Sequence, residues 1–263
     1  MFTVKYHGDA LPTYHKVDVG EHPQWAIPEE VPVAFVFNRR NYAVMMATPD
    51  DLVDFALGFS LSEQVVKSIA DIVSLDIYQT QQGVDFRFKI IGSSVEKLEL
   101  TQRRRNMVGS ASCGLCGLEN AETLFVKLPK TTKVKRKLDM SALSKALVAF
   151  PQHQPLNEHT HSVHAAAWVS LFGEIAFARE DVGRHNALDK LLGAMARAEV
   201  DVKQGFVLMS SRCSYEIVEK AAHAGVQAIL SISGPTAFAL RKAREGNIAI
   251  YARSGKETAY LIE

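Results

Sequence analysis

The chain has 263 residues, 47% of them hydrophobic and 22% charged, which is typical of a folded globular protein and excludes a disordered or collagen-like chain. Lys and Arg total 30 and Asp and Glu total 29, so the net charge of +1 provides no global field for binding nucleic acid or an anionic membrane. Three cysteines are too few for a disulfide framework, and the sequence has no signal-like or membrane-spanning apolar run. We therefore expect a soluble protein of the reducing cytoplasm.

In the first hundred residues, four runs of apolar, β-branched and aromatic residues predict strands: 31–38, 41–47, 72–80 and 84–91. Between the second and third runs, Thr48 at an N-cap position and Pro49 at the first helical position predict a helix that begins at Pro49. A further helix is expected over 95–102. Residues 1–105 are therefore expected to form a smaller α+β domain.

Residues 106–263 are expected to form an α/β domain. From residue 165 onward, strand-like runs alternate with helical ones: strands 165–172, 174–179, 206–210, 228–232 and 247–251, and helices 186–198, 215–224 and 236–245. Such alternation predicts a sheet with parallel strands that is covered by helices. Three polar or small-residue stretches lack a regular period and are predicted to be loops or connections: 101–117, 130–137 and 151–155.

The sequence Cys113-Gly-Leu-Cys116-Gly places two thiols three positions apart, with a glycine that relaxes the backbone between them. Three upstream arginines, Arg103–Arg105, and a helix predicted to start near Gly117 favour the thiolate form. Two glutamates that follow the motif oppose it, so the sign of the net pKa shift stays open.

Other chemistries compete for this motif. One is a structural zinc site, with His159, His161 and His164 as the further ligands. A thioredoxin-type redox site is less favoured, because that motif follows a strand of a βαβ unit and this one lies in a Gly/Ser loop. A zinc deaminase is disfavoured, since its H-x-E and P-C-x-x-C elements are absent. The isolated third cysteine, Cys213, is expected to be a small buried hydrophobe.

The segment 180–186, with the sequence EDVGRHN, lies between a predicted strand and a predicted helix. Backbone N–H groups at a helix start, the glycine Gly183 and the planar guanidinium of Arg184 together suit an anion such as phosphate. The competing interpretation is structural: Asp181 pairs with Arg184, and Asn186 caps the helix.

Six residues after the last predicted strand form a second candidate binding segment: Tyr251, Ala252, Arg253, Ser254, Gly255 and Lys256. The aromatic ring suits stacking on a base or pterin, and the two cations suit phosphates; the alternative is a solvated basic turn. Ligands of α/β sheets gather at the carboxyl ends of strands. This segment is therefore predicted to share one rim with 180–186, 210–212 and 233–236.

Taken together, these motifs resemble the FdhD/NarQ family of formate dehydrogenase accessory sulfurtransferases. The stretches that carry the resemblance are ATPDDLVDFALGFSLSE (47–63), SCGLCG (112–117), HAAAW (164–168), EDVGRHNALDKLLG (180–193), SSRCSYEIVEKAAHAGV (210–226) and SGPTAFALR (233–241). The resemblance implies a cytidine-deaminase-like three-layer α/β domain in the C-terminal part, a smaller α+β domain before it, and a homodimer. One departure is that His161 and Ser162 replace two glycines that many members have.

The resemblance also implies a function. A cysteine desulfurase would pass sulfur to the CxxC loop, which would deliver it to the molybdenum cofactor, as bis-molybdopterin guanine dinucleotide, before that cofactor enters formate dehydrogenase. On this basis we expect Cys113 to carry a persulfide and Cys116 to be the second catalytic cysteine. Residues 251–256, with Gly183 and Arg184, are expected to bind the cofactor, and no permanent metal is expected. The alternative is a non-catalytic, zinc-stabilised chaperone that binds the cofactor.

Overall fold

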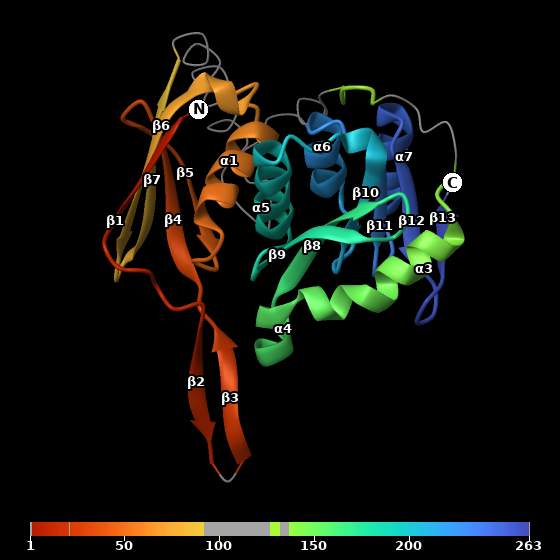
Figure 1. The fold of residues 1–263 in the computed structure, drawn as a ribbon, viewed down its shortest axis with the longest axis horizontal. Helices are drawn as coiled ribbons and strands as arrows, with labels where there is room; N and C mark the ends of the chain where they lie inside the picture. Colours follow the sequence, from red (N-terminus) through yellow and green to blue (C-terminus); the bar gives the residue numbers. More distant parts are fainter. Residues whose placement is uncertain (1, 21, 92–126, 132–136, 263) are drawn as a thin grey trace.

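The structure, a computed structural model, describes residues 2–20, 22–91, 127–131 and 137–262. The molecule has two main bodies, each built on one sheet. One helix of each body lies between the two sheets, and these two helices pack side by side (Figure 1). A two-stranded hairpin, β2 (Tyr14–Val19) and β3 (His22–Pro28), projects away from both sheets (Figure 1).

The first sheet has five strands in the order β1-β6-β7-β4-β5. Their bounds are β1 Thr3–His7, β4 Val31–Phe37, β5 Arg40–Ala47, β6 Ile72–Thr80 and β7 Gly83–Ile90. Helix α1 (Leu52–Ser62) packs on one face, and the short 3-10 helix η1 (Ile69–Asp71) precedes β6. Every second side chain of β4 is buried, because successive side chains of a strand point to opposite faces. One of them, Phe35, stacks on Phe59 of α1 with ring centroids 3.8 Å apart.

The four strands predicted in this half are confirmed to within one residue at each end. Asn38 and Arg39, which connect β4 to β5, have positive φ angles of 46° and 67°, as a two-residue type I′ turn requires. Strand β1 was not predicted; it pairs in parallel with β6. The helix expected over 95–102 lies outside the described residues.

The helix predicted after the second strand is confirmed, but its predicted start is wrong: it begins at Leu52, three residues after Pro49. The residue before the helix is Asp51, which has a left-handed backbone with φ 50° and makes no side-chain cap bond. Thr48 cannot cap the helix because its backbone amide and its hydroxyl bind residues 181 and 182 instead. Tertiary hydrogen bonds therefore override the local start signal.

The second sheet has six strands in the order β13-β12-β11-β10-β8-β9. Their bounds are β8 His164–Ser170, β9 Ile175–Asp181, β10 Gly205–Met209, β11 Ala228–Ser231, β12 Ala249–Arg253 and β13 Ala259–Ile262. The helices that connect β9 through β12 are α5 (Arg184–Arg197), α6 (Tyr215–His223) and α7 (Ala237–Gly246), with the 3-10 helix η4 (Val202–Gln204) before β10. Each connection advances in the same direction along the sheet, so a common handedness places all three helices on one face.

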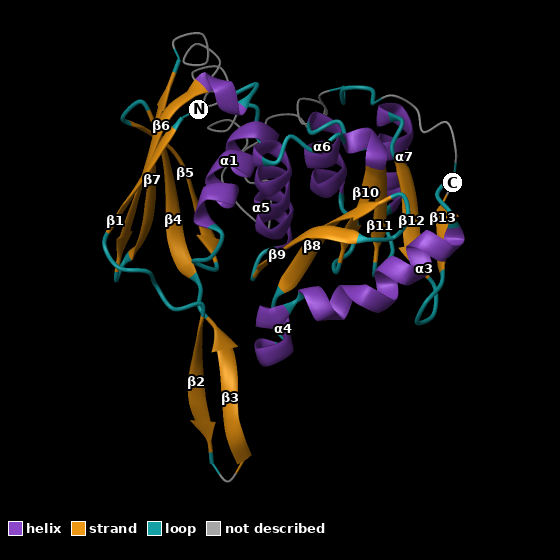
Figure 2. Ribbon diagram, in the orientation of Figure 1, coloured by secondary structure: helices purple, strands orange, loops and turns teal. Residues whose placement is uncertain are grey.

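The other face of this sheet is covered by α3 (Met140–Ala149), which continues into the 3-10 helix η3 (Phe150–His153) and α4 (Pro155–Thr160) (Figure 2). Neighbouring residues of one strand therefore enter different cores: Val207 packs with α5, α6 and α7, and Phe206 packs with Leu143 of α3. The expected α/β class is confirmed, and the layers are helix, sheet and helix.

Three details differ from the expectation. The sheet is mixed, because β8 is antiparallel to both of its neighbours and β13 is antiparallel to β12. Helix α3 and strand β13 were not predicted. The connection predicted over 151–155 belongs to η3 and the start of α4, since Pro151 and Pro155 occupy first-turn positions, where the missing N–H removes no helix hydrogen bond. The domain boundary expected at residues 105 and 106 lies outside the described residues.

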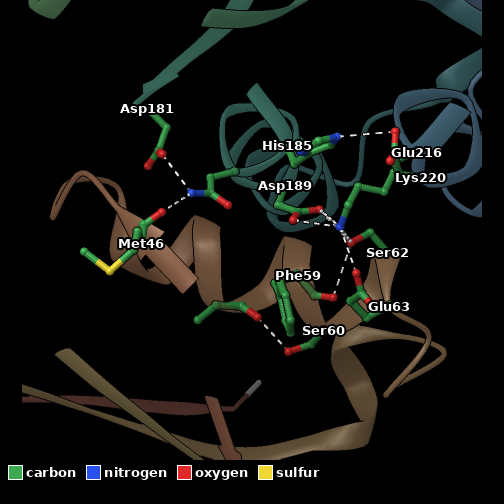
Figure 3. Close-up of polar contacts among 12 residues, drawn as sticks. Met46, Phe59, Ser60, Ser62, Glu63, Asp181, His185, Asp189, Glu216 and Lys220 are labelled. Atoms are coloured by element: carbon green, nitrogen blue, oxygen red, sulfur yellow. Dashed lines mark hydrogen bonds and ion pairs between the residues drawn. The ribbon is translucent and has the colours of Figure 1, made fainter. Parts of the chain in front are cut away.

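The two bodies meet where α1 packs against α5. Lys220 of α6 completes this contact: its Nζ lies 2.9 Å from Asp189 Oδ2 of α5, 2.9 Å from Ser62 Oγ of α1 and 3.1 Å from Glu63 Oε1 (Figure 3). Burial alone would lower the pKa of Lys220, but the carboxylates of Asp189 and Glu63 outweigh it and raise the pKa. The ammonium group is therefore a fixed charge that ties three helices together.

Candidate functional site

The carboxyl ends of four strands lie at one edge of the six-stranded sheet, which we call the carboxyl edge. Strands β10, β11 and β12 are mutually parallel, and β9 runs the same way because the strand between β9 and β10 is antiparallel to both. The topology therefore brings the four predicted segments to this edge: 180–186, 210–212, 233–236 and 251–256. Ligands of α/β sheets bind preferentially at such an edge.

The segments after β10 and β11 are joined to each other. Cys213 forms an isolated parallel bridge with Pro235, and the Thr236 amide donates to the Cys213 carbonyl at 3.1 Å. Ser210 Oγ accepts from the Ala165 amide of β8 at 2.8 Å. These contacts fix the segments after β10 and β11 to each other and to β8 in the middle of the carboxyl edge.

A fully buried ion pair holds the segment after β9. Lys190 Nζ lies 2.8 Å from Asp181 Oδ2, and both side chains are 0% exposed. Asp181 Oδ1 accepts from the Gly183 amide at 2.8 Å and from Asn186 Nδ2 at 2.9 Å. The structural interpretation of this segment is thus corrected in two points: Asp181 pairs with Lys190 and not with Arg184, and the N-cap residue of α5 is Gly183 and not Asn186.

Thr48, which follows β5, connects this ion pair to the five-stranded sheet. Its amide donates to Asp181 Oδ2 at 3.1 Å, its hydroxyl accepts from the Val182 amide at 3.2 Å, and its carbonyl accepts from Lys190 Nζ at 3.0 Å. Asn186 Nδ2 donates to the Met46 carbonyl at 2.8 Å (Figure 3). A buried ion pair is tolerated when its remaining donors and acceptors are satisfied, and Thr48 supplies two such bonds, one to each member of the pair.

Glu180 is occupied in holding α4. Its two carboxylate oxygens accept from the backbone amides of Leu156 and Asn157, each at 2.8 Å, in the first turn of that helix. Burial raises its pKa, these two hydrogen bonds lower it, and the negative charges of Asp50 and Asp51 raise it further. The carboxyl group of Glu180 therefore has a structural role: it holds the first turn of α4 at the carboxyl edge.

Charged side chains gather at the start of α5. Among the described residues, the buried Nε of Arg184 has no hydrogen-bond partner. His185 Nε2 lies 3.7 Å from Glu216 Oε2 of α6, and this imidazole is the main cause that lowers the pKa of Glu216 to about 2 (Figure 3). Burial and then the charge of Arg184 lower the pKa of His164. With the uncapped amides that follow Gly183, these donors suit an anion.

Tyr251 is a core residue, which corrects the expectation that its ring stacks on a ligand. Its side chain is 2% exposed, and its hydroxyl accepts a hydrogen bond from the Leu138 amide at 2.9 Å. The strand ends at Arg253, two residues beyond its predicted end, so Tyr251 lies inside the strand and not at its end. Its neighbour Ala252 is 8% exposed.

Residues 253–256 extend from this strand end into solvent. Arg253, Ser254, Gly255 and Lys256 are all exposed. The Ser254 amide donates to the Thr258 carbonyl at 2.7 Å, and Gly255 has φ +83°, a left-handed conformation that glycine adopts without strain. The two cations are therefore presented on a tight turn and are accessible to an anionic ligand.

The three cysteines differ in what the structure describes of them. Cys113 and Cys116 lie outside the described residues. Cys213 is 0% exposed in the core under α5, α6 and α7, and burial raises the pKa of its thiol to about 12. The expectation that Cys213 is a buried hydrophobe is confirmed.

The histidines considered as zinc ligands lie on α4 and β8. His159 is exposed and stacks on Tyr14 of β2 with centroids 5.6 Å apart, and His161 is exposed with a left-handed backbone at the end of α4. In the part of the chain that the structure describes, no three His, Cys, Asp or Glu side chains are grouped so that they could hold a metal ion.

Sequence reasoning did not predict the contacts that three residues make at this edge: Thr48, Lys190 and Glu216. The stretch EDVGRHNALDKLLG did single out position 190, but a lysine in a helix carries no sign that it is fully buried. The partner of Thr48 lies 133 residues away, so only the tertiary fold shows the bond. No helix in the described part of the chain is long and apolar enough to cross a membrane.

Comparisons with known proteins agree with the resemblance. The chain is 41% identical over 236 residues to "Sulfur carrier protein FdhD" of Cupriavidus necator, which covers 89% of this chain and 81% of that protein. It is 43% identical over 224 residues to the protein of the same name from Xanthomonas euvesicatoria pv. vesicatoria, covering 85% and 79%.

A solved structure shares the fold. The crystal structure of a putative formate dehydrogenase accessory protein from Desulfotalea psychrophila superposes with a TM-score of 0.70 at 22% identity, covering 95% of this chain and 96% of that one. The model of the FdhD/NarQ family matches residues 28–261, which include every strand of the five-stranded sheet except β1, the six-stranded sheet apart from the last residue of β13, and the whole carboxyl edge. The chain therefore belongs to the FdhD/NarQ family.

Proposed function

We propose that this protein is a sulfur carrier that takes sulfur from a cysteine desulfurase and passes it to the molybdenum cofactor of a formate dehydrogenase. The observation that carries the proposal is the Cys113-Gly-Leu-Cys116 motif in a chain 41% and 43% identical to proteins named sulfur carrier. The third cysteine, Cys213, is excluded as the carrier by its burial. The cofactor is the substrate, in its bis-molybdopterin guanine dinucleotide form.

The loading step is a thiol exchange. The thiolate of Cys113 attacks the outer sulfur of the desulfurase persulfide, the sulfur–sulfur bond of the donor breaks, and the donor cysteine leaves as a thiolate. Cys113 then carries a persulfide, and no net oxidation or reduction has occurred.

Delivery as sulfide requires two electrons, and we assign them to Cys116. Its thiolate attacks Sγ of Cys113, which expels the outer sulfur as hydrosulfide and leaves a disulfide between the two cysteines. A cellular dithiol reductant then restores both thiols. Cys116 is therefore required for release but not for loading.

The carboxyl edge supplies the groups that a phosphorylated cofactor needs. Arg184 at the start of α5, with the amides after Gly183, would contact phosphates, as would Arg253 and Lys256 on the exposed turn. Ser254 and Gly255 shape that turn, and the buried residues Tyr251 and Ala252 fix its base on the sheet. We also propose that the protein works as a homodimer.

The test is to incubate the protein with a cysteine desulfurase and cysteine, trap it with an alkylating reagent and locate the added sulfur by mass spectrometry. In the wild-type protein we expect a mass increase of one sulfur on Cys113, and in Cys113→Ala we expect none. In Cys116→Ala we expect an undiminished persulfide, and we expect no release of its outer sulfur when the assay contains no dithiol. A normal persulfide yield in Cys113→Ala would overturn the assignment.

Metal analysis distinguishes the alternative, a non-catalytic chaperone stabilised by zinc. A carrier is expected to take up sulfur without bound metal. Stoichiometric zinc that is lost in Cys116→Ala or His161→Ala, together with no sulfur uptake, would favour the chaperone.

A further inference from the structure

A large groove lies on the five-stranded sheet, and none of its described lining residues belongs to the carboxyl edge. Its volume is about 1250 Å³. It is bounded by β1, by η1 and the start of β6, by the start of α1, and by the end of α5 with the residues after it. This volume exceeds the roughly 300–1,000 Å³ of small-molecule pockets, which favours a segment of polypeptide as the occupant.

The floor of the groove is apolar. Phe2, which directly precedes β1, and Val4 and Tyr6 of β1 stand at every second position and therefore share one face of the sheet. Tyr6 is 56% exposed, and Val73 at the start of the neighbouring strand β6 is 45% exposed. Exposed apolar side chains that line the same groove are a mark of an interaction site.

The wall of the groove is acidic. Among its described lining residues are four carboxylates, Asp50, Asp51, Asp54 and Glu199, and one cation, Arg197. Asp54 is buried and already bonded by Arg197 at 2.6 Å.

Two of these carboxylates are available. Asp50 and Glu199 are exposed, and neither forms an ion pair with any residue that the structure describes. Asp51, by contrast, lies 3.3 Å from Arg179. An apolar floor beside unpaired negative charge is complementary to a segment that carries aliphatic and basic side chains.

We propose that this groove is a docking site for a cationic amphipathic segment of a partner protein. Its aliphatic side chains lie on Val4, Tyr6 and Val73, and its lysines or arginines pair with Asp50 and Glu199. The negative wall disfavours an anionic membrane surface as the occupant. This inference is independent of sulfur transfer.

The groove lies close to the carboxyl edge along the chain. Asp50 lies two residues after Thr48, whose amide is bonded to Asp181 at the end of β9. A partner docked in the groove is therefore held close to the segment that begins α5.

The experiment measures binding of two fluorescent amphipathic peptides by the full chain. One peptide is built of Leu and Lys, and the other has Glu in place of every Lys. We expect the Leu/Lys peptide to bind about tenfold more tightly than the Leu/Glu peptide, with a preference that declines as salt is raised. In Asp50→Lys/Glu199→Lys the preference should invert.

The matched control is Glu30→Lys/Glu158→Lys, which changes the net charge equally on exposed carboxylates outside the groove. It should leave the preference intact. A photo-reactive residue placed at Val73 should cross-link the Leu/Lys peptide, and one at the exposed Phe172 should not. Failure of both peptides to bind, equal binding of the two, an unchanged preference in the groove variant, or cross-linking of Val73 to a second copy of the chain would each overturn the proposal. None of these outcomes affects the persulfide test.

Discussion

Gly58 of α1 and Gly193 of α5 each lie directly against the backbone of the opposite helix. A Cβ on Gly58 would overlap the Asp189 carbonyl, and a Cβ on Gly193 would overlap the Asp54 carbonyl. Both positions are helical, so the glycines are needed for close approach and not for an unusual backbone. The two bodies of the molecule are therefore joined by direct contact between the backbones of α1 and α5.

We expect Gly193→Ala to destabilise the protein by at least about 2 kcal/mol, because the added methyl group forces two helix backbones apart. Urea unfolding measures the loss. The matched control is Gly246→Ala in α7, where the nearest atoms to an added Cβ are 3.7 Å away. Equal stability of the two variants would contradict the proposed close contact.

Lys190→Met is expected to cost about 3–5 kcal/mol, because it leaves the carboxylate of Asp181 buried without its counter-charge. Asp181→Asn in the same chain should recover part of this loss, since it removes the unpaired charge. A double-mutant cycle by denaturant unfolding measures the coupling. Simple additivity of the two substitutions would show that the pair is not coupled in the folded protein.

His164 provides a prediction about pH. Its pKa lies below the usual 6.5, so the folded state favours the neutral imidazole. The stability that this contributes is present above pH 6.5 and declines as the pH falls through the folded pKa. Arg184→Gln should raise the pKa of His164, because it removes a nearby positive charge. NMR titration of the imidazole measures this, and Lys145→Gln, on the far helix α3, should leave the value unchanged.

Cys213 is expected to resist alkylation in the folded protein, because its thiol is fully buried and its pKa is raised to about 12. It should react with iodoacetamide only after denaturation, as peptide mass spectrometry can show. Cys213→Ala should retain full sulfur loading. Rapid labelling of the native thiol would mean that this core opens readily.

How much of the fold could be predicted from the sequence depends on how far apart in the chain the interacting residues lie. The strands over 31–47 and the helix over 184–197 have local signals, namely residue type, period and flanking turns, and were predicted closely. The start of α1 was predicted wrongly because the bonds of Thr48 cross to a distant strand end. Tyr251 was correctly placed near a strand end, but its burial depends on α3, an element without a recognised signal.

The motif EDVGRHN illustrates the same limit within the site. Its position between a strand and a helix was predictable from local pattern, whereas the choice between an anion site and a structural segment stayed open. The role of Asp181 was not, because the lysine that pairs with it lies two helical turns further on and carries no local mark of burial.

The three hydrogen bonds of Thr48 have a consequence for how the molecule opens. The amide of Thr48 is bonded to Asp181, and the amide of Val182 is bonded to Thr48, so each amide has its partner in the other half of the chain. Neither half can unfold locally at this point without exposing an amide of the other half to water. The hydrogens of these two amides should exchange with deuterium only through global unfolding. A fragment of either half would lack the hydrogen bonds that hold the strand end at residue 181.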